Sequence, residues 1–259
     1  QENLKIRDRF FMILGVRFDR HNRFGTEVTY RLAPAVVLET GTRIKATYGT
    51  GFKAPSLYQL FAPTAEWGPV GNENLLPEKS RGWDVGIEQY LWENRLAVSF
   101  TYFHNNFDAL ILYDWLLGYI NIKKAVTRGF EILLSAQPLK PLTLQGSYTY
   151  TDAFDKDTNE QLLRRPKHKA NFNIHLRISK KTDADLNILY VGKRIDLFPY
   201  PVRTEAPAYT LLNLAAAYRL SKNFEIFGRI VNLLDKEYEA VLGYGSPRRS
   251  AYIGIKANY

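Results

Sequence analysis

The chain has 259 residues, of which 46% are apolar, 14% aromatic and 24% charged, and its formal net charge is +9. This apolar fraction excludes an intrinsically disordered protein, and the absence of a long apolar run excludes a membrane-spanning helix. With no cysteine, disulfide scaffolds and thiolate metal sites are excluded as well. Basic and acidic residues are interleaved along the chain, so the charge does not indicate a nucleic-acid-binding stripe.

Strict alternation of polar and apolar residues is the main local pattern. From Lys169 to Ile178, every even position is apolar and every odd position is polar. This period of two is typical of strands with one apolar and one polar face. In chain order, it predicts about twelve strands, at residues 8–20, 26–39, 42–53, 80–92, 95–113, 118–137, 141–154, 165–179, 183–194, 208–220, 223–233 and 248–259.

The lengths of these strands and of their connections favour a membrane protein. Many strands exceed the ~5–6 residues common in soluble proteins and match the ~9–11 residues that cross a bilayer. Short turns near residues 40–41, 93–94, 138–141, 180–182 and 221–222 alternate with longer loops at 21–25, 54–79, 114–118, 155–165, 195–207 and 235–247. Outer-membrane β-barrels combine short turns at one end with long loops at the other, whereas soluble sandwiches mix their loop lengths.

Aromatic residues and the last strand point the same way. Tyr148 and Tyr150 lie near a predicted strand end, where a bilayer interface favours tyrosine. The final predicted strand alternates through to Tyr259, which shares the apolar face. We therefore expect residues 1–259 to form a single transmembrane β-barrel domain.

Five motifs follow one another along the chain. They read GTGFKAPSL at 49–57, NENLLPEKS at 72–80, TRGFE at 127–131, LRRPKH at 163–168 and VNLLDKEY at 231–238. In this order they resemble the signature motifs of TonB-dependent outer-membrane receptors. The run at 51–60 is most similar to the cobalamin (vitamin B12) receptor branch, and siderophore and haem receptors share diluted forms of it.

The resemblance implies a fold, a location and a mechanism. Its receptors are 22-stranded barrels closed around a plug domain, and this sequence resembles their C-terminal part, with neither the plug nor the TonB-contacting segment. We expect an all-β antiparallel barrel in the outer membrane of a Gram-negative bacterium, contacting lipid and lipopolysaccharide. Its wall would be completed by the remaining receptor strands, by closure on itself or by another copy.

The function implied is uptake of cobalamin or a similar bulky nutrient, energised by TonB through a plug. An iron–siderophore or haem receptor and a plugless diffusion pore remain as alternatives. No cofactor is expected, since the four histidines are dispersed. A barrel hydrolase is the alternative from another class, with His104 or His175 as base and Ser99 or Ser147 as nucleophile.

Two sets of residues are candidates for the site. The motif residues are expected to position loops and wall, because proline ends a strand and asparagine and aspartate cap backbone groups. Glu78 is expected to pair with Lys79 or Arg81. The motif set is Gly51, Phe52, Lys53, Ala54, Pro55, Asn72, Asn74, Leu75, Pro77, Glu78, Arg128, Gly129, Glu131, Asn232, Asp235, Tyr238 and Tyr259.

The second set comprises the aromatic residues of the long loops, which we expect to contact a cobalamin or a metal chelate. Rings cover a bulky ligand at little cost in side-chain entropy. The alternatives are that they pack the loops or contact lipopolysaccharide sugars. These ligand candidates are Tyr58, Phe61, Trp67, Trp115, Phe198, Tyr200 and Tyr244.

Overall fold

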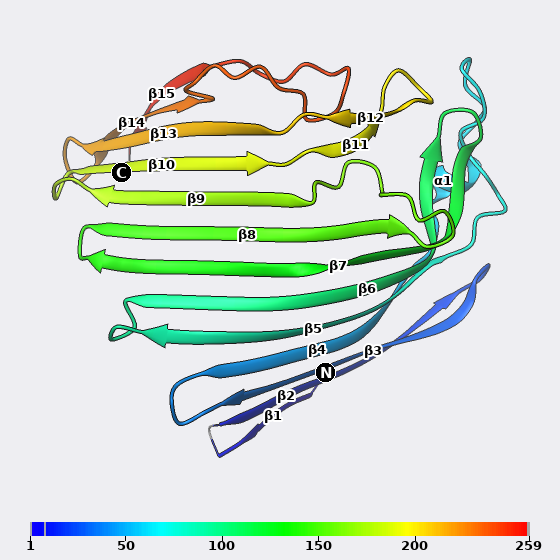
Figure 1. Cartoon of the computed structure of the whole chain (residues 1–259), viewed down its shortest axis with the longest axis horizontal. Helices are drawn as coiled ribbons and strands as arrows, with labels where there is room; N and C mark the ends of the chain where they lie inside the picture. Colours follow the sequence, from blue (N-terminus) through cyan, green and yellow to red (C-terminus); the bar gives the residue numbers. More distant parts are fainter. Residues whose placement is uncertain (1, 8, 258–259) are drawn as a thin grey trace. The chain divides into compact units, whose positions relative to one another are not determined.

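A computed structural model describes residues 2–7 and 9–257, so Tyr259 lies outside the described residues. Within them, thirteen strands form one sheet in chain order, and β11 and β12 form a separate two-stranded ribbon. Figure 1 shows the strands side by side in this order. No helix of the described chain is both long and apolar enough to cross a membrane.

The element bounds are as follows. The sheet contains β1 (Glu2–Ile6), β2 (Phe10–His21), β3 (Gly25–Val37), β4 (Arg43–Lys53), β5 (Glu78–Leu91), β6 (Leu96–Asp114), β7 (Gly118–Leu139), β8 (Leu142–Asp155), β9 (His168–Arg177), β10 (Thr182–Val191), β13 (Tyr209–Arg219), β14 (Phe224–Val231) and β15 (Ser250–Ala257). The ribbon contains β11 (Arg194–Leu197) and β12 (Arg203–Ala206), and one short helix, α1, spans Leu57–Phe61.

All twelve predicted strands are present, with bounds shifted by a few residues. The sequence did not reveal β1, β11, β12 or α1. The ribbon strands have four residues each and β1 and α1 have five, too few for a period to stand out.

The strand register converts the alternation into two distinct faces. Antiparallel pairing of β9 with β10 sets Asn173 opposite Asn187 and Phe172 opposite Ile188. Polar residues therefore meet polar residues on one face, and apolar residues meet on the other. Asn187 Nδ2 donates to Asn173 Oδ1 (2.7 Å), which links amides of the polar face to one another.

Contacts divide the chain into two compact units, which we describe separately. Unit 1 comprises Gln1–Ile87, Thr101–Gly129 and Asp152–Leu162. Its small core of Leu60, Leu75 and Ile111 lies under α1, with Phe24 and Tyr119 packed against it. This core joins α1 to the β2–β3 turn and to the end of the β6–β7 hairpin, which lie at the same end of the strands (Figure 1).

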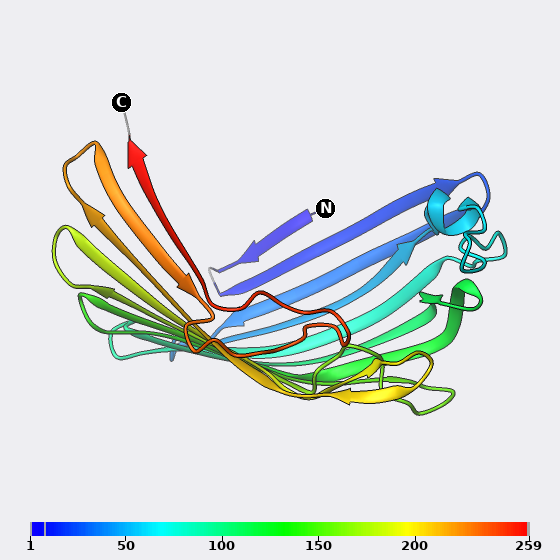
Figure 2. The same ribbon diagram turned by 90° about the horizontal axis from the view of Figure 1, so that it is seen from above.

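Unit 2 comprises Glu88–Phe100, Phe130–Thr151 and Leu163–Tyr259. The β9–β10 and β13–β14 turns lie at one end of its strands, and the β11–β12 ribbon and the 232–249 segment lie at the other (Figure 2). Within this unit, the short turns predicted from the sequence therefore lie at one end of the strands and the long loops at the other.

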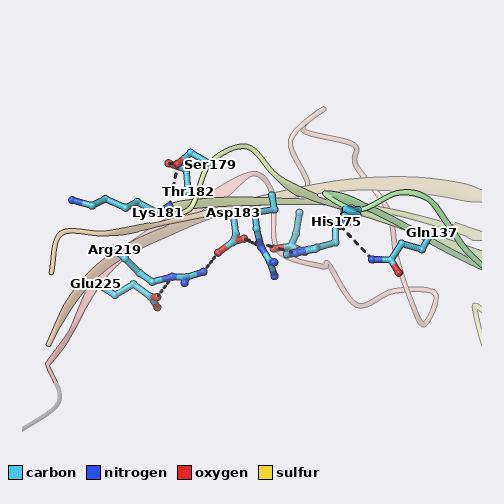
Figure 3. Close-up of polar contacts among 11 residues, drawn as sticks. Gln137, His175, Ser179, Lys181, Thr182, Asp183, Arg219 and Glu225 are labelled. Carbon is cyan, nitrogen blue, oxygen red and sulfur yellow. Dashed lines mark hydrogen bonds and ion pairs between the residues drawn. The ribbon is translucent and has the colours of Figure 1, made fainter. Parts of the chain in front are cut away.

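Near the short turns of unit 2, side chains of alternating sign form a row across the polar face (Figure 3). Asp183 on β10 accepts a hydrogen bond from Arg177 Nε on β9 (3.4 Å) and another from Arg219 on β13. Arg219 also pairs with Glu225 on β14 (3.8 Å). Neighbouring strands are tied together by charges that compensate one another.

Candidate functional site

Helix α1 places two predicted ligand residues of unit 1 at the surface. Pro55 ends the preceding segment, and Ser56 caps the helix, its Oγ accepting from Gln59 N–H (3.2 Å) while Gln59 Oε1 accepts from Ser56 N–H (2.9 Å). Reciprocal bonds of this kind satisfy amides that a helix start leaves free. The resulting turn directs Leu60 into the core and leaves Tyr58 and Phe61 exposed.

Two asparagines fix the loop after α1 to the β6–β7 hairpin. Asn72 Nδ2 donates to the carbonyl oxygen of Tyr119 (2.9 Å). Asn121 Oδ1 accepts from Leu76 N–H (2.8 Å), and Asn121 Nδ2 donates to the carbonyl oxygen of Ala109 (2.6 Å). Asn72 was predicted to be structural, whereas Asn121 was missed because it lies inside a strand pattern.

Glycines allow the backbones of this loop and hairpin to approach each other. Gly118 has a φ of +74°, and a Cβ there would lie 2.6 Å from the Val70 carbonyl oxygen. Gly71 is equally confined, since a Cβ would lie 2.6 Å from the backbone nitrogen of Ala62. Only glycine fits such contacts, so the hydrogen bond from Tyr119 N–H to Val70 O (2.9 Å) depends on them.

Glu78 connects three strands, but not through the predicted partners. Its Oε2 pairs with Lys53 Nζ on β4 (2.7 Å), and its Oε1 accepts from Ile111 N–H on β6 (2.8 Å). The expectation of a Lys79 or Arg81 partner was wrong, because residues an odd number of positions apart in a strand point to opposite faces of the sheet. These two cations pair elsewhere, Lys79 with Glu27 and Arg81 with Asp108.

Four further motif residues of unit 1 pair, pack closely or are buried. Arg128 pairs with Asp152 (3.1 Å) and lies over the Phe154 ring, which joins β7 to β8. Gly51 lies so close to β5 that a Cβ would be 2.5 Å from Ser80 Oγ. Leu75 belongs to the core, and Gly129 is buried.

Helix α1 and the β6–β7 hairpin together form an aromatic cluster, which we define as Tyr58, Tyr113, Trp115 and Tyr119. Ring centroids are 6.3 Å apart for Tyr58–Tyr119, 5.2 Å for Tyr113–Tyr119 and 5.4 Å for Tyr113–Trp115, all in edge contacts. Tyr58 is 63% and Trp115 49% exposed. The structure thus brings together the predicted Tyr58 and Trp115 and adds Tyr113 and Tyr119. The sequence analysis did not select these two tyrosines, because they lie at strand ends rather than in a loop.

The other two candidates of unit 1 are exposed outside this cluster. Phe61 lies under the Arg23 guanidinium, 5.6 Å from its ring centroid. Trp67 lies in the turn closed by the bridge between Ala65 and Gly68.

In unit 2, two buried charged residues of β11 connect this strand to distant loop segments. Arg194 is 4% exposed and donates to the carbonyl oxygens of Pro207 (3.2 Å) and Ala240 (2.9 Å). Asp196 is fully buried and accepts from Arg164 Nε (2.8 Å) and Leu242 N–H (3.0 Å). Burial by itself raises the pKa of Asp196, but these donors outweigh it and hold the pKa below its ordinary value.

The VNLLDKEY motif folds the chain after β14. Asn232 is buried with a φ of +54°, and its amide both donates to the Lys236 carbonyl oxygen (2.9 Å) and accepts from Lys236 N–H (2.9 Å). Asp235 accepts from Arg248 Nε (3.0 Å) and Nη2 (2.8 Å). Arg248, with Arg249 N–H, lowers the pKa of Asp235 to about 2.

The ligand candidates of unit 2 lie in the two segments that Arg194 and Asp196 connect, the β11–β12 turn and residues 232–249. Phe198 and Tyr244 are exposed, and the Phe198 ring packs against Gly243, whose φ is +82°. Tyr200 is half-buried in the turn between β11 and β12. Tyr238, expected to be structural, packs against Tyr209 with 4.6 Å between ring centroids and the ring planes tilted by 39°.

The histidines do not form a hydrolytic site. His175 Nδ1 binds Asp185 (2.8 Å), and His104 stacks on Trp83. Among the described contacts, neither is paired with Ser99 or Ser147. In the same described part of the chain, no group of three or more His, Asp or Glu side chains is arranged to hold a metal ion.

Comparisons with known proteins agree on one family. Residues 1–233 match the family model described as "TonB dependent receptor-like, beta-barrel". The chain is 32% identical over 247 residues to the vitamin B12 transporter BtuB of Photobacterium profundum. That alignment covers 92% of this chain and 39% of the relative, so the chain spans about two-fifths of the relative's length.

Several solved structures have the same fold, and they include siderophore receptors and a copper transporter, OprC. A ferric enterobactin receptor (PfeA) variant from Pseudomonas aeruginosa aligns at a TM-score of 0.82 and 22% identity, covering 99% of this chain and 44% of that one. The siderophore receptor PirA from Acinetobacter baumannii aligns at 0.82 and 20% identity, with 99% and 44% covered. At these identities the likeness shows the fold. The family model and the relatives place the chain in the Gram-negative outer membrane, and these relatives are transporters and receptors, not enzymes. The chain therefore belongs to the β-barrel part of the TonB-dependent receptor family.

Proposed function

We propose that this chain forms part of the wall and outer loops of a transporter that captures cobalamin, and that the aromatic cluster contacts the ligand. The support is the 32% identity with a vitamin B12 transporter, together with the exposure of Tyr58 and Trp115 at the loop end of unit 1. Active uptake by the intact protein would be energised by TonB, as the family name implies.

The observation that carries the proposal is that the cluster is held in place before any ligand arrives. Asn72 and Asn121 bind the backbone on either side of it, and Gly118 allows close backbone contact. Rings fixed in this way lose little conformational freedom on binding, so more of the contact energy appears as affinity. A corrin ring offers the broad, partly flat surface that edge-packed tyrosines and a tryptophan cover well.

A ferric siderophore is the second candidate. Arg23 is exposed beside Phe61 at the edge of the same loop region, and a guanidinium attracts an anionic chelate. Two of the solved structures of similar fold are siderophore receptors by name.

Equilibrium binding to the intact protein distinguishes the two candidates. We expect cyanocobalamin to bind and ferric enterobactin not to bind. The double variant Tyr58→Ala/Trp115→Ala is expected to bind cyanocobalamin at least about tenfold more weakly, since central aromatic contacts are worth more than ~1 kcal/mol each.

Phe18→Ala is the matched control, because Phe18 is an exposed ring on the apolar face of β2 and lies outside the aromatic cluster. It should bind like the unmodified protein. Tight binding of ferric enterobactin without cyanocobalamin binding would overturn the first choice, and equal affinity in the double variant would remove the cluster from the ligand site.

A further inference from the structure

Five asparagines form a chain of hydrogen bonds across the polar face of unit 2. The backbone N–H of Asn232, after β14, donates to Asn213 Oδ1 on β13 (2.9 Å). Asn213 Nδ2 donates to Asn187 Oδ1 on β10 (2.9 Å). Asn187 Nδ2 donates in turn to Asn171 Oδ1 (2.6 Å) and Asn173 Oδ1 (2.7 Å) on β9. All of these bonds therefore run in one direction, from the end of β14 toward β9.

The backbone at the start of this chain sets its direction. A side-chain amide can turn over and exchange its oxygen with its NH₂ group, whereas a backbone N–H only donates. Asn232 is 1% exposed, so Asn213 must present its oxygen to the N–H of this buried residue. The Asn213 NH₂ group then faces the Asn187 oxygen, and the Asn187 NH₂ group faces the oxygens on β9. A single backbone group thus orients every side-chain amide of the chain.

The chain ends in two NH₂ groups, those of Asn171 and Asn173. Both side chains are half-buried, and neither Nδ2 atom has a hydrogen-bond acceptor within residues 2–7 and 9–257. The two residues are two positions apart on β9, so they share a face and lie ~6.6 Å from each other. Since their oxygens are already bound, the pair offers donors alone. It therefore matches a group with acceptor oxygens and disfavours one that presents only N–H groups.

A hollow on the same face adjoins this pair. It has a volume of about 420 Å³ and is lined by residues of β9, β10, β13 and β14, among them Asn173, Asn187, Ala215 and Arg229. Arg229 lies over the Tyr252 ring, 4.6 Å from its centroid, and makes no ion pair in the described part of the chain. Asp185, which also lines the hollow, is engaged by His175 Nδ1 (2.8 Å). In a transmembrane barrel the apolar face contacts lipid, so the polar face and its hollow line the interior.

We propose that Asn171 and Asn173 form a second site for the transported nutrient, which binds its acceptor oxygens inside the barrel after capture at the loops. Arg229, across the hollow, donates to the same ligand. Cobalamin suits such donors, because it carries several amide carbonyls and a phosphate diester. The inference rests on the proposed uptake of cobalamin and extends it from capture at the loops to passage along the wall.

Hydrogen exchange of side-chain amides in the intact protein tests the direction of the chain, and it needs no ligand. With ¹⁵N-labelled asparagine, the NH₂ groups of Asn187 and Asn213 should exchange slowly and those of Asn171 and Asn173 fast. Asn213→Asp keeps the oxygen that accepts from Asn232 N–H and removes the NH₂ group. The remaining amides should then turn over, so that the NH₂ groups of Asn171 and Asn173 become slow and their oxygens face the interior.

Uptake of radiolabelled cyanocobalamin by cells that produce the intact protein tests the ligand. Asn171→Asp/Asn173→Asp keeps the shape of both side chains but replaces donors with acceptors, so the uptake rate at saturating ligand should fall about tenfold. Binding at the cell surface should not change. Asn213→Asp should lower the uptake rate in the same direction from two strands away. The control Asn223→Asp, which adds the same charge in the exposed β13–β14 turn, should leave uptake unchanged.

A neutral pair of substitutions separates the loss of the donors from the added charge. Asn171→Ala/Asn173→Ala removes both NH₂ groups without adding a carboxylate, and it should lower the uptake rate as well. This pair also replaces the aspartate pair if the aspartate pair does not fold. Folding is checked by heat-dependent migration in gels.

Slow exchange of the Asn171 and Asn173 NH₂ groups in the unmodified protein would overturn the proposal, because another part of the protein would then bind these donors. Unchanged exchange in Asn213→Asp would overturn it as well. Surface binding of cyanocobalamin with normal uptake by both pairs of variants would overturn this inference and leave the proposed function standing. Absence of surface binding by the unmodified protein would overturn both.

Discussion

Arg164 Nε donates a 2.8 Å hydrogen bond to the fully buried carboxylate of Asp196, from a position 32 residues earlier in the chain. Arg164 N–H also donates to the Ile195 carbonyl oxygen (2.7 Å), and Arg164 has a φ of +58°. The LRRPKH motif therefore acts by joining the entry of β9 to the β11–β12 ribbon. Asp196 then extends the connection to Leu242 in the last long loop.

Asp196→Asn should loosen the 232–249 segment. The amide removes the charge that Arg164 neutralises and can set an NH₂ group against Leu242 N–H, at a cost of ~1–3 kcal/mol for a buried unsatisfied group. We expect faster cleavage of this segment in limited proteolysis of the folded protein. Glu205→Gln, which alters an exposed pair with Lys193, is the control and should be cleaved at the original rate. Equal rates for both variants would contradict the role assigned to Asp196.

Asp235 predicts an acid-labile contact after β14. Its pKa is lowered from 3.8 to about 2 in the folded protein, so its stabilising effect is complete above pH 3.8 and is lost as the pH falls toward about 2. Hydrogen exchange at Arg249 N–H, which donates to Asp235 Oδ1 (2.9 Å), should accelerate across this interval, beyond its intrinsic pH dependence. In Asp235→Asn the acid-dependent step should vanish, and its persistence would assign the transition to another group.

Asn121→Ala should release the loop that supports the aromatic cluster. The change removes three hydrogen bonds to backbone groups of Leu76 and Ala109. The Ala109 carbonyl oxygen is part-buried, so its unpaired state costs up to ~1–3 kcal/mol, whereas water can replace the two exposed bonds to Leu76 at a smaller cost. We expect faster proteolysis within 62–77 and weaker cyanocobalamin binding. Asn223→Ala in the exposed β13–β14 turn serves as control, with neither property changed. Weaker binding without faster proteolysis would indicate that Asn121 itself contacts the ligand.

The row of charges near the short turns predicts a salt-dependent change in stability. The Asp183 side chain is 15% exposed and serves both Arg177 and Arg219, whereas that of Asp185 is 57% exposed and serves His175. Asp183→Asn should lower the denaturant midpoint more than Asp185→Asn, because it leaves two guanidiniums without their carboxylate. The difference should narrow in high salt, since exposed charges are screened. Equal midpoints at low salt would show that the row does not stabilise the wall.

Prediction from the sequence succeeded where a pattern repeats along a segment. The odd–even alternation of β8, β9 and β10 gave the strands and their faces, because register preserves parity across each pair. It failed where the signal is too short or lies in another segment. The Lys53–Glu78 pair does not follow from local spacing, since it depends on how the chain turns after β4. The capping box of Ser56 and Gln59 is a local signal, but a search for periodic segments does not detect it.

The candidate site shows the same division. Tyr58 and Trp115 were selected as exposed loop aromatics, but Tyr113 and Tyr119 resembled ordinary strand residues. Phe198 and Tyr244 were selected as ligand candidates and are exposed, whereas the buried Arg194 and Asp196 nearby in the fold gave no signal. Arginine and aspartate in a polar loop normally predict solvent exposure.

By itself, the sequence determined the strands, the two faces of the wall, the separation of short turns from long loops, and the family resemblance. A period of two and a set of turn residues are local properties, and they survive whatever the chain does elsewhere. The tertiary structure decided which distant groups meet: Arg164 with Asp196, Asn121 with Leu76, and Asn232 with Asn213. Such pairings depend on register and loop closure across tens of residues, which no local pattern encodes.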